Sequence, residues 1–173
     1  MPTKKTGTQV LLPANVWFIR FSLLAALLLD LLPLGRAAWM PDFLAVVLVF
    51  WNIRRPQRIG LAVGFFFGLA LDVHQAALLG QNALAYSVLS YFAVMIHRRV
   101  LWYPWPTRLL QLFLLFSSSH LIITVIRRLA GGMLPGWQAL LAPILETLMW
   151  PIIFYLLEAP QRRAPDPDAN RPI

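Results

Sequence analysis

Apolar residues run along the chain in six stretches, which polar and proline-containing segments separate. A helix that crosses a membrane needs about 20 largely apolar residues, within a range of about 17–25. The second and third stretches are the shortest, and Pro41-Asp42 interrupts the second, so five spans remain an alternative. Pro143 and Pro151 break the sixth stretch. The pattern predicts an all-α integral membrane protein, a bundle of six transmembrane helices, with spans at Val16–Pro33, Ala37–Ile53, Ile59–Leu71, Leu78–Ile96, Thr107–Ile126 and Trp137–Leu157.

The two ends of the chain differ from these stretches. Residues 1–15 are polar and include Lys4 and Lys5, and residues 159–173 carry four prolines among Arg, Asp and Asn. Neither segment can bury enough apolar surface to fold. We therefore expect a disordered tail at 1–15, a six-helix transmembrane domain at 16–158 and a second disordered tail at 159–173.

Composition supports the membrane interpretation. The chain is 59% hydrophobic and 13% charged and has no cysteine, whereas a soluble domain is about 45–50% apolar and about 25% charged. These values exclude a disulfide scaffold and a disordered acidic chain, and they argue against a cytosolic enzyme. The formal net charge of +8 raises nucleic-acid binding as an alternative, which would need the basic residues to gather on one face.

The basic residues are instead distributed unequally between the two sides of the membrane. With six spans and the N-terminus inside, only Arg36, Arg127 and Arg128 of the 15 basic residues fall outside. This asymmetry matches the positive-inside rule and predicts that both termini are cytoplasmic, whereas five spans would break the alternation. We therefore expect no nucleic-acid partner, and instead an orientation signal with some attraction to anionic membrane lipid. The twelve inside residues are Lys4, Lys5, Arg20, Arg54, Arg55, Arg58, Arg98, Arg99, Arg108, Arg162, Arg163 and Arg171.

Acidic residues within the spans are the candidates for function. An aspartate at the centre of a membrane helix costs at least about 2.5 kcal/mol. At a rise of about 1.5 Å per residue, Asp30, Asp72, His120 and Glu146 all fall at the midplane or in the outer half of the membrane. Asp42 starts the second span from the outer side. Together they predict a polar pocket or a buried network that opens to the outside.

Simpler interpretations of these residues stay open. Asp30 and Asp42 can be helix-end residues, since Asp42 after Pro41 would face the first turn of a helix and its dipole. Glu146 and His120 can form a pair, or His120 can hydrogen-bond within its own helix beside Ser117 and Thr124.

The third span contains Gly60, Gly64, Gly68 and Asp72 at steps of four residues. Such spacing keeps the glycines near one helix face, where another helix can approach closely. The partner helix can belong to another protein or to this chain. In the turn that follows, Gly80 can supply a positive φ and Asn82 can cap the next helix.

Motifs of catalysis are missing from the sequence. There is no G-x-S-x-G, phosphate-binding loop, H-E-x-x-H or cysteine, and the three histidines are scattered. No nucleophile–base pair or metal-ligand spacing is visible, so we expect no catalytic residue, metal or cofactor.

Four short motifs resemble a known family. They are Pro41-Asp42, the basic segment 54–58, the glycine run that ends in Gly68-Leu-Ala-Leu-Asp72, and Leu79-Gly80-Gln81-Asn82-Ala83-Leu84. In this combination, concentrated in residues 40–92, they resemble the bacterial rod shape-determining protein MreD family. The resemblance adds Pro41 and Gln81 to the candidate polar residues.

The resemblance implies a multi-pass subunit of the cell-elongation machinery in the bacterial inner membrane. Such a subunit is a scaffold that binds MreC and, indirectly, MreB filaments, the RodA polymerase and its transpeptidase; a homo-oligomer is also possible. The chain is also similar to the substrate-binding subunits of energy-coupling-factor vitamin transporters, which are six-helix bundles. A small-molecule transporter subunit is therefore the alternative function.

Overall fold

The computed structural model describes residues 15–32, 39–133 and 135–161, and within these ranges every regular element is a helix. The predicted tails lie outside the described residues, apart from Asn15 and residues 159–161. The elements are α1 (Val16–Leu31), α2 (Phe43–Arg54), α3 (Gly60–His74), α4 (Gln81–Trp102), α5 (Trp105–Leu129), a 3₁₀ turn η1 (Trp137–Leu140), α6 (Leu141–Glu158) and a 3₁₀ turn η2 (Ala159–Gln161).

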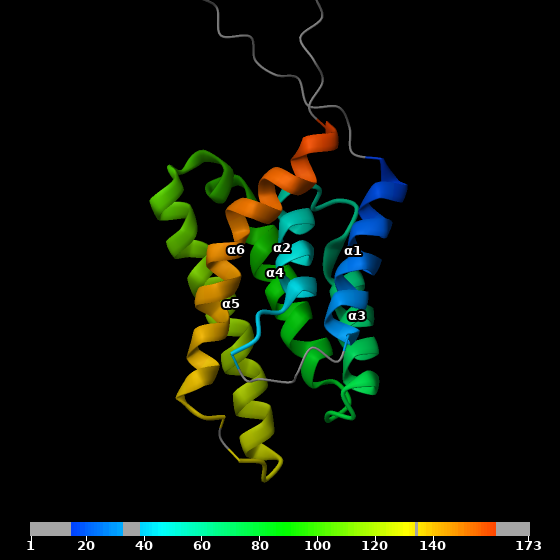
Figure 1. Cartoon of the computed structure of the whole chain (residues 1–173), viewed down its shortest axis with the longest axis vertical. Coiled ribbons are helices and arrows are strands. Elements are labelled where there is room, and N and C mark those ends of the chain that lie inside the picture. The colour runs from blue at the N-terminus through cyan, green and yellow to red at the C-terminus, as the bar shows by residue number, and fades with distance from the viewer. Residues whose placement is uncertain (1–14, 33–38, 134, 162–173) are drawn as a thin grey trace, which may run out of the picture.

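Helix α2 forms the centre of the bundle. Its residues from Leu44 to Ile53 are all buried, as expected for a helix that is apolar all round. It packs against α1, α4 and α6, while α3 packs on α4 and α5 packs on α4 and α6. In Figure 1, α1 and α3 lie on one side of this centre, and α5 and α6 lie on the other.

Consecutive helices run in opposite directions, so the start of α1 and the end of α6 lie at the same end of the bundle, at the top of Figure 1. We call this the basic end, because Arg54, Arg55, Arg58 and Arg108 lie there. The opposite end, where α1 and α3 finish and α2, α4 and α6 begin, is called the acidic end. It carries Asp30, Asp42, Asp72 and Glu146.

The prolines of the last apolar stretch do not interrupt its helix as the sequence suggests. Helix α6 runs through Pro143, in its first turn, and through Pro151 in its interior, so the expected breaks do not occur. A proline in the first turn removes no intrahelical bond, whereas one in the interior removes one. Helix α2 starts only at Phe43, after the Pro41-Asp42 interruption.

Two helical segments in the described part of the chain are long and apolar enough to cross a membrane alone, Trp105–Leu129 and Trp137–Gln161. Helices α2 and α3 are apolar but shorter. At about 1.5 Å per residue α2 is roughly 18 Å long, less than the hydrocarbon thickness of about 30 Å. The number of spans and the side of each terminus therefore remain predictions.

Labelling of single cysteines tests this topology, because the natural chain has none. Met133 is 93% exposed beyond the acidic end, and Gln57 is exposed at the basic end. A membrane-impermeant maleimide applied to intact spheroplasts should label Met133→Cys and spare Gln57→Cys until the cells are lysed. Labelling of Gln57→Cys in intact cells would contradict cytoplasmic termini.

Candidate functional site

Three carboxylates meet at the first turn of α2. Asp30 Oδ1 accepts from Phe43 N at 3.1 Å, and its Oδ2 accepts from Leu44 N at 2.7 Å. Asp42, the N-cap residue, accepts from Ala45 N at 2.7 Å. Glu146 Oε1 accepts from Asp42 N at 3.1 Å. The backbone N–H groups that a helix start leaves without an intrahelical partner are thereby all satisfied.

The same carboxylates join the acidic end to the other helices. His120 Nε2 of α5 lies 2.8 Å from Glu146 Oε1 of α6. Of the two interpretations left open for His120, the structure therefore shows the pair with Glu146. The Tyr86 hydroxyl of α4 donates to Asp42 Oδ2. Five helices (α1, α2, α4, α5 and α6) therefore share one polar network. The network lies inside the bundle, since Tyr86 is 0% exposed and Glu146 is 1% exposed.

The Asp72 carboxylate accepts the backbone N–H groups at the start of α4, as the carboxylates described above do for α2. It is 0% exposed and accepts from Gly80 N at 2.9 Å, Asn82 N at 2.8 Å and Ala83 N at 3.3 Å. Gly80 has the positive φ expected of it, +95°. The expectation that Asn82 caps α4 is wrong, because the Asp72 carboxylate, arriving from α3, already occupies that position. Asn82 is instead the second residue of α4, and its side chain donates to Gln75 Oε1 at 3.4 Å.

The glycine steps of α3 face α4 of the same chain. A Cβ on Gly68 would lie 2.5 Å from Ala83 Cα, and one on Gly64 would lie 2.5 Å from Ser90 Oγ and 2.8 Å from Tyr86 O. Gly60 instead has open space and a φ of +59° at the start of the helix. The space left by Gly64 and Gly68 is thus filled from within the chain, and a helix of another protein has no room there.

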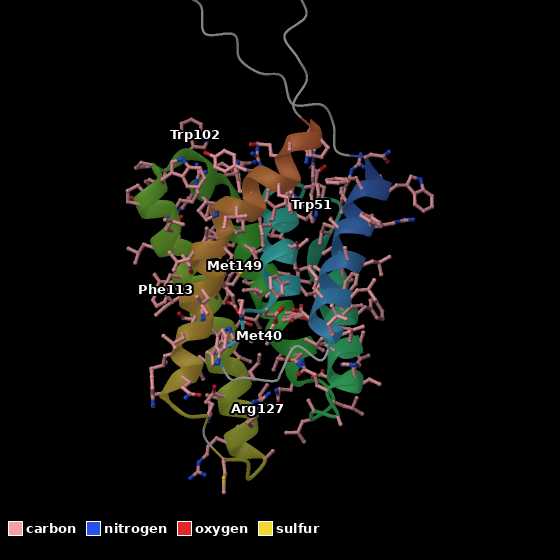
Figure 2. All side chains as sticks on the ribbon, in the orientation of Figure 1. Met40, Trp51, Trp102, Phe113, Arg127 and Met149 are labelled. Carbon is pink, nitrogen blue, oxygen red and sulfur yellow. The ribbon has the colours of Figure 1, made fainter. Side chains whose placement is uncertain are left out.

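A cavity of about 1270 Å³ opens beside the network at the acidic end. Met40 and Arg127, labelled in Figure 2, are part of its wall, as are Pro41 and Asp42. Gln81 also lines it, is 2% exposed, and its Nε2 has no hydrogen-bond partner within the described part of the chain. Among the described residues, no group of three or more His, Asp or Glu is placed to hold a metal ion.

Tyr86 is the member of this network that the sequence analysis does not predict. Its sequence signal is its position, because a tyrosine within an apolar span lies away from the interface that such rings prefer. Its hydroxyl needs a partner when buried, and the carboxylates of the acidic end are the partners within reach.

Tyr86→Phe should lower the stability of the bundle. The change removes one hydrogen bond to a carboxylate and leaves Asp42 Oδ2 without that donor, a loss of about 1.5–3 kcal/mol. Tyr91→Phe is the matched control, since Tyr91 lies on the same helix and is 51% exposed. Thermal unfolding of the detergent-purified protein measures the difference. Equal midpoints for the two variants would show that the hydrogen bond between Tyr86 and Asp42 adds nothing to stability.

Comparison with known proteins gives one family and one relative. The sequence model of the family described as "rod shape-determining protein MreD" matches residues 13–159. A curated protein of Haemophilus influenzae (strain ATCC 51907 / DSM 11121 / KW20 / Rd), named "Rod shape-determining protein MreD", is 28% identical over 154 residues. The match covers 85% of this chain and 93% of that protein. No solved structure matches the chain.

Proposed function

Because the chain belongs to the rod shape-determining protein MreD family, we propose that it is a non-enzymatic scaffold subunit of the cell-elongation complex. The family is part of the shape-determining system together with MreC and MreB, and it is not known for catalysis. On this proposal the chain is a multi-pass protein of the bacterial inner membrane. It binds an MreC-like membrane protein, and through it organises the MreB-linked RodA polymerase and transpeptidase.

The use of the acidic residues is the observation that supports a scaffold best. Asp30 and Asp72 each accept backbone N–H groups with both carboxylate oxygens, and Asp42 bonds one backbone N–H and one tyrosine hydroxyl. Carboxylates held this way fix the positions of helices α2 and α4. A catalytic carboxylate would need at least one oxygen turned to a substrate.

The surface that contacts a partner protein lies away from the glycines of α3. Gly64 and Gly68 retain a helix-packing role in the proposal, but between α3 and α4 of this chain. Partner contacts then fall on the exposed apolar faces, such as Phe66 of α3, Leu121 of α5 or Ile152 of α6, which are 66%, 63% and 67% exposed. The same faces are available to a second copy of the chain.

The transporter alternative is not favoured, because the family match concerns cell shape. The cavity beside Gln81 is where the transporter alternative would place its small ligand. The scaffold proposal gives this cavity no ligand.

Complementation tests the proposed function. The chain is expressed in a rod-shaped bacterium depleted of its own MreD, and cell shape is scored by microscopy. The proposal predicts that rods are restored. Round cells that nevertheless contain full-length, membrane-inserted protein would count against it.

A further inference from the structure

A second hollow lies at the basic end, about 370 Å³ in volume, between the end of α2, the α2–α3 turn and the last part of α4. Arg54, Arg55, Arg58 and His97 line it, and Ile53 and Leu101 contribute apolar wall. The positive-inside rule requires arginines at this end of the protein, but it does not require three of them around one hollow.

The arginines of the hollow differ in their partners. Arg54 is ion-paired with Glu158, and its guanidinium carbon lies 4.8 Å from the centre of the Phe154 ring. No ion pair is found for Arg55 or Arg58 among the residues that the structure describes. A backbone hydrogen bond from Arg58 N to Arg55 O, 3.0 Å long, closes the turn that carries both residues. The hollow therefore carries an excess of positive charge.

The surroundings place this hollow at the level of lipid headgroups. Trp102 and Tyr103, at the end of α4 beside Leu101, are 91% and 45% exposed, and such rings gather at the membrane–water interface. The ring of His97 lines the hollow, and its Nδ1 donates to Val94 O. A lining that combines apolar side chains with cations suits a molecule with an acyl part and an anionic head.

We propose that this hollow binds the phosphate of an anionic membrane lipid, held by the guanidinium groups of Arg55 and Arg58. Guanidinium binds phosphate oxygens in a two-point geometry, and basic pockets between membrane helices on the cytoplasmic side bind anionic headgroups. The volume lies in the range of small-molecule sites, about 300–1,000 Å³, and so fits a headgroup rather than a whole lipid. This inference does not depend on the scaffold function.

Native mass spectrometry of the full chain, released from detergent with added lipid, tests the proposal. Phosphatidylglycerol is compared with zwitterionic phosphatidylcholine, and the double variant Arg55→Gln/Arg58→Gln with Arg98→Gln/Arg99→Gln. The control pair removes the same charge from exposed positions of α4 at the same end, outside the hollow.

Loss of one hydrogen bond between a guanidinium and a phosphate weakens binding by about tenfold or more, so the double variant should bind phosphatidylglycerol about 100-fold less than the natural chain. The control pair should stay close to the natural chain. An equal loss in both pairs would overturn the proposal, because binding would then follow net charge alone. Inorganic phosphate that displaces the lipid at equal concentration would overturn the lipid source, and binding of an acidic peptide in place of lipid would overturn it as well. If the double variant fails to fold, Arg58→Gln alone, at an exposed position, should lose about tenfold.

Discussion

Gly68→Ala is expected to separate α3 from α4 and to destabilise the bundle more than any other change of one methyl group. The added Cβ would lie 2.5 Å from Ala83 Cα, 2.6 Å from Ala83 N and 2.6 Å from Asn82 O. These are backbone atoms, so no side chain can rotate out of the way. Overpacking of this kind costs about 1–3 kcal/mol and at times more, and we expect the upper part of that range.

The separation would also weaken the start of α4. Ala83 N and Asn82 N are donors to Asp72, which lies one helical turn after Gly68 on α3. Moving the two helices apart lengthens both hydrogen bonds. The midpoint of thermal unfolding and the yield of monodisperse protein after size exclusion measure the effect.

Gly136→Ala is the matched control for this prediction. A Cβ at Gly136 meets nothing within 4 Å, and its φ of −61° suits any residue. The control should unfold at the midpoint of the natural chain. A Gly68→Ala protein that unfolds at that same midpoint would show that α3 and α4 are not in close contact.

Asp72→Asn is the other change for which we expect a large loss of stability. Asparagine has the shape of aspartate but retains one acceptor oxygen, and its NH₂ group would face backbone N–H donors. At least one of the amides of Gly80, Asn82 and Ala83 then loses its acceptor in a buried site. A buried donor without a partner costs about 1–3 kcal/mol, so the change should cost roughly 2–5 kcal/mol with the lost charge included.

Asp30→Asn is the comparison for Asp72→Asn. Asp30 also accepts two backbone amides, but it lies on the wall of the cavity and is only partly buried, so water can replace a lost bond. Asp72→Asn should therefore disturb rod shape more than Asp30→Asn in a complementation assay. If both variants restored rods as well as the natural chain does, the larger role that we give to Asp72 would be contradicted.

The helical class and the approximate position of each helix could be predicted from the sequence, because apolar stretches between prolines and charges are a local signal. The capping role of Asp42 was among the open interpretations for the same reason, since Pro41-Asp42 before an apolar run is a local pattern. Family membership followed from short motifs, and it is confirmed by the match over residues 13–159.

The use of Asp30 and Asp72 could not be predicted in this way. Each of them bonds the start of a helix other than its own, and that depends on how two helices are placed together. The glycines of α3 predicted a close helix neighbour, but only the packing identifies it as α4. Tyr86 joins the network through its contact with Asp42, which is 44 residues away in the sequence.

The most direct test of the scaffold claim is cross-linking in living cells. Because the chain has no cysteine, single cysteines at Phe66, Leu121 and Ile152 each report one exposed face. Membranes of rod-shaped cells that depend on each variant are treated with a thiol-reactive cross-linker, and the adducts are identified by mass spectrometry. The account predicts adducts with an MreC-like membrane protein from at least one of these faces. Cells that stay rod-shaped while no face gives an adduct with any member of the shape-determining system would contradict it.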